Sequence, residues 1–280
     1  MEFSQQLDST MKETLTEKQW QEFDERGFVI LGRLFDDETL STLQQRIDDI
    51  MLGKADCDYD RIMMQLDSTD GSYSKAGPQS YGHKGATLDY RKIQQLEYDP
   101  VYLDYMQRPV FKHICERVYG AGTDISCFRA MFFNKPARKG TYLPWHQDRW
   151  NNLDRDPLVT VWTALDPCTE TNGAVKLIPG SHKKGCINPS HGSGFMTEEQ
   201  AQEHCRAEDM VYLELEAGEV ALLHNWVMHS SDINRTGISR RGFSTCYMEA
   251  ATRTNSGGSY PVVFGEGALV PYGEESLVNS

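Results

Sequence analysis

Hydrophobic residues in the first part of this chain recur at the spacing of α-helices. Between 36 and 52 they fall three or four positions apart and would share one helix face: Leu40, Leu43, Ile47 and Met51. A helix is also expected over 16–27, with Gly27 at its C-terminal end, and the pattern of 100–119 is again mostly helical. The polar residues 1–15 are predicted to form a flexible arm.

After about residue 124 the pattern changes to short apolar runs that end at turn residues. Runs of this length, rich in β-branched and aromatic residues, predict β-strands. They cover 127–133, 158–165, 174–178, 211–215, 220–224 and 242–248, and a similar run lies earlier, at 28–31. Short strands separated by turns predict a β-sandwich or jelly roll. We therefore expect a mainly β fold with flanking helices, in one domain over 1–280.

Two polar segments interrupt this pattern. Residues 53–86 are rich in Gly, Ser, Asp and Tyr and predict a long loop. A loop of this length in a compact domain is usually functional or disordered, and we interpret it as a candidate lid over a substrate. Residues 183–210 form a polar insert in which 197–205 is expected to be helical.

Charge and cysteine content narrow the classes of function. The formal net charge is −13, so the basic surface that a nucleic-acid-binding protein needs is not expected. The seven cysteines include no C-x-x-C pair, which indicates reduced thiols. Neither a secretory signal nor an apolar run long enough to cross a bilayer is visible. We expect a cytoplasmic monomer or homodimer that acts on a small molecule and binds neither nucleic acid nor membrane.

The most specific chemical signal is the sequence His146-Gln147-Asp148. Residues separated by one position point to the same side of a strand, so His146 and Asp148 can reach one metal ion. Two imidazoles and one carboxylate bind iron(II) in non-haem oxygenases and leave coordination positions open. The second imidazole must come from another part of the chain. His224 and His229 are the candidates, and they would point to opposite faces if one strand contained both.

Five motifs in order along the chain are more specific than this sequence alone. They are Pro144-Trp145-His146-Gln147-Asp148, Val161-Trp162-Thr163-Ala164-Leu165-Asp166, Asn172-Gly173-Ala174, Ile178-Pro179-Gly180-Ser181-His182, and His229-Ser230-Ser231-Asp232-Ile233-Asn234 with Arg240. Over roughly 16–250 the chain resembles the phytanoyl-CoA dioxygenase family. The resemblance implies a double-stranded β-helix, iron(II), 2-oxoglutarate as co-substrate, and O₂. It also implies that the catalytic iron ligands are His146, Asp148 and His229.

The distal carboxylate of 2-oxoglutarate requires a guanidinium in a dry pocket. Arg240 has the spacing from His229 that the family uses, and Arg241 is the alternative. Arg240 is favoured because on a strand it would share a face with small residues, namely Gly242, Ser244 and Cys246.

Three further residues match family positions at the co-substrate. Ser231 could donate its hydroxyl to the same carboxylate. Trp162 would pack against the co-substrate, although a core aromatic is almost as good an interpretation. Lys92 matches a family lysine that reaches 2-oxoglutarate, and a solvated lysine is its alternative.

Arg129, Trp150 and Asn225 are the candidate substrate residues. Arg129 would lie on the strand before the metal ligands, Trp150 follows them, and Asn225 precedes His229. An arginine beside an asparagine and an aromatic residue indicates a small polar substrate with an anionic or zwitterionic group. Amino acids, phosphonates, osmolytes and natural-product intermediates belong to this class. Pairing of Arg129 with an acidic neighbour and packing of Trp150 in the core are the alternatives.

The predicted function is hydroxylation of such a metabolite, with succinate and CO₂ as co-products. Asp148 favours hydroxylation, because related halogenases lack this carboxylate and bind chloride in its place. Desaturation, cyclisation or epimerisation would use the same iron chemistry and stays an alternative, as does a long acyl-CoA substrate. A non-catalytic jelly-roll binding protein is the alternative from another class, and the intact ligand set weighs against it.

Overall fold

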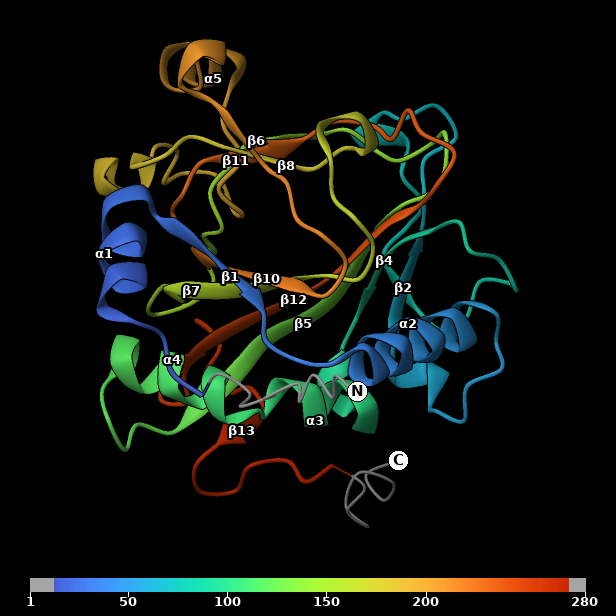
Figure 1. Ribbon diagram of the computed structural model, residues 1–280, viewed down its shortest axis with the longest axis horizontal. Coiled ribbons are helices and arrows are strands. Elements are labelled where there is room, and N and C mark those ends of the chain that lie inside the picture. The colour runs from blue at the N-terminus through green and yellow to red at the C-terminus, as the bar shows by residue number, and fades with distance from the viewer. Residues whose placement is uncertain (1–12, 272–280) are drawn as a thin grey trace, which may run out of the picture.

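The structure is a computed structural model, and it describes residues 13–271. Two antiparallel β-sheets face each other, and helices cover the outer face of the larger sheet (Figure 1). The predicted mainly β fold with flanking helices is therefore confirmed. Two facing sheets of antiparallel strands form the double-stranded β-helix, or jelly roll.

The larger sheet has nine strands in the order β1-β10-β7-β12-β5-β4-β2-β3, with β13 paired to β5. Their bounds are β1 Phe28–Arg33, β2 Met63–Leu66, β3 Ser80–Tyr81, β4 Tyr90–Gln94, β5 Ile125–Lys135, β7 Val159–Ala164, β10 Glu219–His224, β12 Arg240–Glu249 and β13 Val262–Phe264. The outer face packs on the helices in the main hydrophobic core. The inner face packs against the smaller sheet in a second cluster that includes Trp162 and Leu223.

The smaller sheet has the order β6-β11-β8-β9. Its strands are β6 Leu143–His146, β8 Val175–Leu177, β9 Val211–Leu213 and β11 His229–Ser231. Because β6 and β11 are neighbours, two histidines that are far apart in the sequence meet in space.

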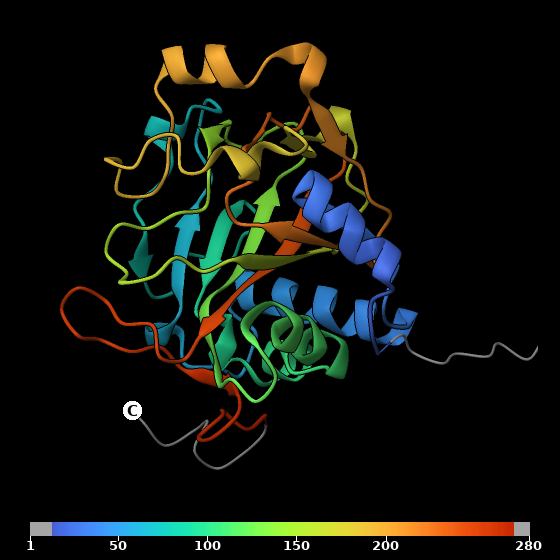
Figure 2. The ribbon, with the colours of Figure 1, turned by 90° about the vertical axis from the view of Figure 1, so that its left-hand side faces the viewer.

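The helices follow the local signals closely. α1 (Glu17–Arg26) begins with a capping box at Thr16 and ends at Gly27, which adopts a left-handed conformation with φ 78°. The expected helix over 100–119 is divided into α3 (Pro100–Met106) and α4 (Pro109–Tyr119), because proline cannot continue a helix from the preceding turn. The remaining helices are α2 (Asp37–Met51) and α5 (Glu198–His204), with short 3₁₀ helices η1 Tyr59–Arg61, η2 Tyr73–Lys75, η3 Leu96–Tyr98, η4 Glu170–Asn172, η5 Ser181–Lys184 and η6 Ala207–Asp209. Figure 2 shows α5 at the top, beyond the two sheets.

The structure corrects the prediction of one long loop over 53–86. Strand β2 lies inside this segment and extends the larger sheet beyond β4, and β3 pairs with β2. The four residues of β2 are too few to give a strand pattern, although Met64 is completely buried. The predicted arm is also shorter than expected, since Leu15 is in the core. Residues 1–12 of that arm lie outside the described residues.

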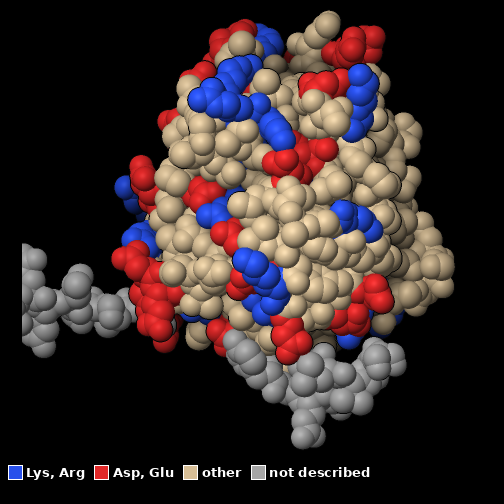
Figure 3. Space-filling model, turned by 90° about the vertical axis from the view of Figure 1, so that its right-hand side faces the viewer, with Lys and Arg blue, Asp and Glu red and all other residues tan. Residues whose placement is uncertain are grey.

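Basic and acidic side chains are interspersed on the face drawn in Figure 3. Between residues 13 and 271, no helix is long and apolar enough to cross a bilayer.

Candidate active site

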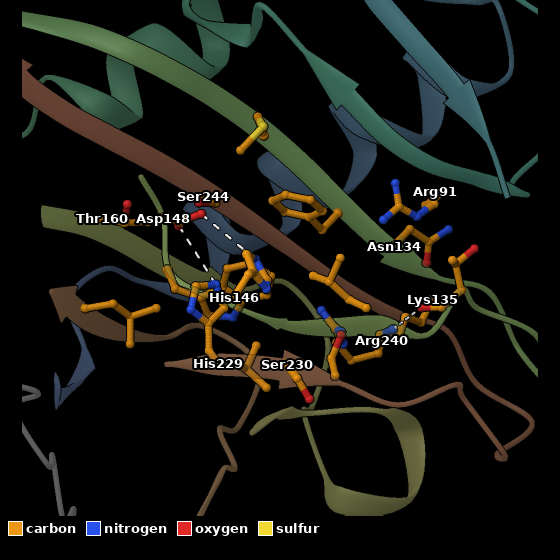
Figure 4. Close-up of a pocket in the computed structure, with 18 residues that line it drawn as sticks. Arg91, Asn134, Lys135, His146, Asp148, Thr160, His229, Ser230, Arg240 and Ser244 are labelled. Atoms are coloured by element: carbon orange, nitrogen blue, oxygen red, sulfur yellow. Dashed lines mark hydrogen bonds and ion pairs between the residues drawn. The ribbon is translucent and has the colours of Figure 1, made fainter. Parts of the chain in front are cut away.

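Neighbouring strands of the smaller sheet carry the candidate metal ligands. His146, at the end of β6, lies opposite His229 at the start of β11, and their ring centroids are 4.0 Å apart. The carboxylate of Asp148 lies 4.0 Å from Nε2 of His146 and 3.9 Å from Nε2 of His229. One potential ligand atom from each residue lies within 4.8 Å of the other two (Figure 4). Convergence of these three side chains is what a facial iron(II) triad requires.

Backbone carbonyls orient both imidazoles. Nδ1 of His146 lies 2.8 Å from the carbonyl oxygen of Pro144, and Nδ1 of His229 lies 2.9 Å from that of Val227. Each Nδ1–H can donate to its carbonyl, which leaves the lone pair of Nε2 directed at the shared centre. Burial and the nearby His229 lower the pKa of His146 well below 6.5, so the neutral, metal-binding form is favoured.

Asp148 is held by a residue that we had expected at the substrate. The backbone N–H of Asp148 donates to the carbonyl of Asn225 at 2.7 Å. The Asn225 side chain is 1% exposed, accepts from Thr160 Oγ1 at 2.7 Å, and donates to the Pro157 carbonyl at 3.0 Å and to Cys246 Sγ at 3.3 Å. Both Nδ2 hydrogens of Asn225 are thus used inside the protein, and its backbone supports Asp148. These contacts favour a supporting role over the predicted substrate contact.

His224 lies away from this centre. It is at the end of β10, where its ring packs on His182 and Phe23, and its Nδ1 accepts from the backbone N–H of Trp226. Of the two histidines left open by the sequence, the structure therefore brings His229, and not His224, to the His-x-Asp strand.

The pocket continues from these ligands to Arg240, along the inner face of the larger sheet (Figure 4). Arg240 is 2% exposed, donates from one terminal nitrogen to the Gly173 carbonyl at 2.8 Å, and has no partner for Nε. The next residue, Arg241, points outward and forms ion pairs with Asp166 and Asp48. Arg240 is therefore the guanidinium available to a ligand, on the face that its small neighbours predicted.

The position of Trp162 explains why Gly242, which shares a strand face with Arg240, must be small. The guanidinium carbon of Arg240 lies 5.5 Å from the Trp162 ring centroid. A Cβ on Gly242 would come within 2.6 Å of Cζ2 of this indole. Ser231 lines the same pocket from β11, and so does Ser230, whose buried hydroxyl has no partner among the described residues.

Two cations at this end of the pocket were missed. Lys135 lines the pocket and donates to the Thr141 carbonyl at 2.6 Å, and burial, with Arg240 and Arg91 close by, lowers its pKa well below 10.5. Alternation along β5 from Arg129 through Phe133 could have identified Lys135. Arg91 also lines the pocket and donates to Gln65 at 2.8 Å. No sequence signal separated Arg91 from its neighbour Lys92.

Lys92 is 9% exposed. Its backbone pairs with β2 and β5, and its ammonium forms no hydrogen bond or ion pair with any of residues 13–271. Burial, followed by the charges of Arg91 and Arg129, lowers its pKa to about 7, while Asp148 acts in the opposite direction. Asp148, at the metal end of the pocket, is therefore among the charges that influence Lys92.

Arg129 lies over two aromatic rings. Its guanidinium carbon is 4.7 Å from the Trp150 centroid and 4.8 Å from the Phe128 centroid. Trp150 is 5% exposed and belongs to a small core cluster, so its ring supports Arg129 from below. The Arg129 guanidinium makes no hydrogen bond within the described part of the chain, and Asp148 is among the charges that influence it.

An aromatic wall closes one side of the ligand set. Phe195 stacks on His146 at 4.8 Å, and Tyr73, from the segment predicted as a lid, packs against Phe195 at 5.4 Å. Gln147 anchors the Phe195 loop, because its backbone N–H donates to the Gly194 carbonyl and its side chain to that of Gly185. The lid function of 53–86 stays a prediction.

Known proteins share this sequence pattern. The family model described as phytanoyl-CoA dioxygenase matches residues 23–242, which include every ligand discussed above. The chain belongs to the phytanoyl-CoA dioxygenase family. It is 23% identical over 256 residues to the phytanoyl-CoA dioxygenase of Arabidopsis thaliana, covering 85% of this chain and 90% of that one. The human peroxisomal phytanoyl-CoA dioxygenase is 24% identical, with 89% and 72% covered.

Solved structures share the fold of this family member. EctD from S. alaskensis, solved with 2-oxoglutarate and 5-hydroxyectoine, superimposes with a TM-score of 0.64 at 20% identity, covering 86% of this chain and 78% of that one. SnoK, a non-haem α-ketoglutarate-dependent carbocyclase from nogalamycin biosynthesis, gives 0.61 at 16% identity, with 87% of both chains covered.

The chain is thus a dioxygenase of the class that depends on iron(II) and 2-oxoglutarate. The side chains of this family member fit both cofactors. Two imidazoles with their Nε2 atoms free, next to a carboxylate, match iron(II). A buried arginine with an unpartnered nitrogen matches an anionic co-substrate.

Proposed function

We propose that this dioxygenase hydroxylates a small polar metabolite that is anionic or zwitterionic. One observation carries the proposal: His146, Asp148 and His229 converge at one end of a pocket that has Arg240 at its other end. This arrangement allows a chelating, doubly charged co-substrate to bind a metal ion and a guanidinium at the same time.

His146, Asp148 and His229 are proposed as the iron ligands. The Pro144 and Val227 carbonyls hold the two rings in the tautomer that binds metal, and the Asn225 carbonyl holds the backbone of Asp148. Bound iron(II), 2-oxoglutarate and O₂ supply oxidation of a C–H bond, with succinate and CO₂ as co-products. The protein residues fix where the substrate lies relative to this centre.

Arg240, Ser231 and Trp162 are proposed to hold the distal carboxylate of 2-oxoglutarate. Arg240 offers a charged donor in a dry site, Ser231 offers a hydroxyl from the opposite sheet, and Trp162 packs beside the guanidinium. Lys92, which matches a family lysine that reaches 2-oxoglutarate, stays a proposed contact of that co-substrate, and Arg91, Arg129 and Asp148 are the charges that influence it.

Arg129 supports the anionic class of substrate. Its guanidinium is oriented by Trp150, has no acceptor in the described protein, and lies near Asp148. Other outcomes of the same chemistry stay alternatives, and the carbocyclase activity in the name of SnoK illustrates one on this fold. A reducing, cytoplasmic location is also proposed, because none of the seven cysteines forms a disulfide.

The test is iron-dependent conversion of 2-oxoglutarate to succinate by the purified protein, without added substrate. The wild-type protein is expected to show slow conversion that requires iron(II) and O₂. His229→Ala should abolish it, whereas His113→Ala, on α4, should not change it. Absence of conversion and of iron binding in the wild type would favour the non-catalytic binding protein. Screening small acids for faster succinate formation, with isotopically labelled O₂ traced into the product, then distinguishes hydroxylation from desaturation or cyclisation.

A further inference from the structure

A second basic residue lies directly opposite Arg240 in the larger sheet. Arg240 is the first residue of β12, and it faces Lys135, the last residue of the neighbouring strand β5. Both side chains line the pocket, at the end away from the metal ligands (Figure 4). Like charges in directly opposite positions of neighbouring strands destabilise a sheet. The pairing of Arg240 with Lys135 therefore requires a physical reason.

Gly173 shows that these two side chains converge. Its carbonyl accepts from Arg240 at 2.8 Å, and a Cβ on this glycine would come within 2.7 Å of Cδ of Lys135. A Cβ on Gly140 would come within 2.9 Å of Cβ of the same lysine. Two glycines thus leave room for the lysine stem, and the fold keeps this side chain next to the acceptor of Arg240.

Backbone carbonyls are the only acceptors that residues 13–271 provide for the two side chains. Lys135 donates to the Thr141 carbonyl at 2.6 Å, Arg240 donates to that of Gly173, and neither forms an ion pair. Thr141 is itself held in place, because its hydroxyl donates to Asp67 at 2.6 Å. Burial and the charge of Arg240 lower the pKa of Lys135, as expected for an ammonium without a carboxylate beside it. Buried basic groups whose donors are not all used favour an anionic ligand.

Arg91 also lines the pocket but is less well placed to share a ligand with Arg240. It lies on β4, one strand beyond β5. Its guanidinium donates to Gln65 at 2.8 Å and lies 5.0 Å from the Tyr73 ring centroid. Lys135, by contrast, is the cross-strand neighbour of Arg240.

We propose that Lys135 binds the distal carboxylate of 2-oxoglutarate together with Arg240. A carboxylate has two oxygens, so it can accept from the guanidinium and from the ammonium at the same time and compensate both charges. The inference rests on the proposed function and adds a co-substrate residue that the sequence did not reveal. Lys135 makes the pocket selective for 2-oxo acids with an anionic distal group, because a neutral group leaves both basic side chains without a counter-ion.

Binding of two 2-oxo acids separates this role from a purely structural one. 2-Oxoglutarate and 2-oxopentanoate share the keto-acid end, but 2-oxopentanoate has no distal carboxylate. Their affinities are measured by calorimetry under nitrogen, with iron(II) bound to the protein. Lys135→Met keeps an apolar stem beside Gly140 and Gly173 and removes the ammonium. It should weaken 2-oxoglutarate about 10-fold or more and leave the affinity for 2-oxopentanoate within about two-fold of the wild type.

Lys176→Met is the matched control for loss of a buried ammonium. Lys176 is 9% exposed on β8, and its ammonium lies 3.2 Å from the carboxylate of Asp232. On this strand Val175, and not Lys176, lines the pocket. The ratio of the two affinities should therefore stay at the wild-type value. An equal fall of this ratio in both variants would overturn the proposal.

Two other results would also contradict it: unchanged 2-oxoglutarate affinity in Lys135→Met, or equal weakening of both 2-oxo acids. If this variant does not fold, a crystal structure of the wild-type protein with 2-oxoglutarate decides. Nζ of Lys135 should then lie within about 3.2 Å of a distal carboxylate oxygen, and an ammonium that contacts only Thr141 overturns the proposal. Failure of the proposed function is different, because 2-oxoglutarate would then not bind to the iron-loaded wild type at all.

Discussion

The two sheets contribute opposite chemistry to one pocket. The smaller sheet and the residues just after it provide two imidazoles and a carboxylate, His146, His229 and Asp148. Hydrogen bonds to backbone groups orient each of these residues. The larger sheet provides buried or partly buried cations, and the most isolated of them, Arg129 and Lys92, have no acceptor in the described protein.

This difference indicates which part of the function each sheet supports. Groups whose remaining hydrogen bonds are satisfied by the protein present a fixed geometry to a metal ion. Cations that have no acceptor in the protein can bind an anionic ligand that enters and leaves the pocket. Substitutions on the smaller sheet should therefore abolish the chemistry, whereas those on the larger sheet should change affinity or stability.

Asp148→Ala should have the largest effect on turnover. Without the carboxylate, iron(II) affinity should fall by more than the roughly 10–100-fold that is typical for loss of an outer-shell partner. Succinate formation should then be undetectable. Asp104→Ala, an exposed aspartate on α3, is the control, and both quantities should match the wild type. Normal iron binding and turnover in Asp148→Ala would remove the smaller sheet from the proposed chemistry.

Arg240→Ala should have the second-largest effect, and this effect should be on the affinity for 2-oxoglutarate. Loss of a buried charged donor costs about 2 kcal/mol or more, so the KM for 2-oxoglutarate should rise at least ~30-fold, while the KM for the main substrate changes little. Arg241→Ala is the neighbouring comparison. It leaves Asp166 and Asp48 without their partner, so it should lower the free energy of unfolding and leave the KM for 2-oxoglutarate unchanged. The reverse result would place Arg241 in the pocket.

Gly242→Ala should have a smaller effect. The new Cβ would lie 2.6 Å from the Trp162 indole, and overpacking of this kind costs about 1–3 kcal/mol. Denaturant unfolding should show this loss, together with a modest rise in the KM for 2-oxoglutarate as Trp162 shifts beside Arg240. Gly237→Ala is the control, because its Cβ would meet only the end of the Arg138 side chain, at 3.8 Å. Equal stability of the two variants contradicts the tight packing.

The sequence predicted the smaller sheet's contribution better than that of the larger sheet. His146 and Asp148 are close in sequence and share a strand direction, so a motif reveals them. Alternation along β12 also selected the inward face of Arg240 correctly, because that strand is regular up to Cys246.

Bulges and backbone contacts explain what the sequence did not reveal. The register of β4 against β2 shifts at Arg91, so strand alternation alone does not place this side chain in the pocket, and nothing in the residue types signals the shift. Asn225 seemed a substrate residue because it is polar and precedes His229. Its partners, Thr160 and the Pro157 carbonyl, lie more than sixty positions away and become neighbours only in the folded sheet.

Glu97 is a buried, partly unpartnered group that lies outside the pocket. It belongs to η3 beside the larger sheet, is 6% exposed, and has an unpartnered Oε2. Unlike Arg240, whose Nε is also unpartnered, it does not line the pocket. If unpartnered buried groups serve ligands only where they face a cavity, Glu97 should affect stability and not turnover.

Burial raises the pKa of Glu97 from 4.5 to about 7. Between these values the folded protein keeps a proton that the unfolded chain releases, so this group's contribution is fully present below pH 4.5 and is lost as the pH rises through 7. Glu97→Gln stays neutral, so its stability relative to the wild type should increase by about 1–3 kcal/mol between pH 5 and pH 8. Urea unfolding at both pH values measures this difference, and succinate formation should be unchanged. A constant stability difference at the two pH values would mean that the carboxyl group is ionised in the folded protein throughout.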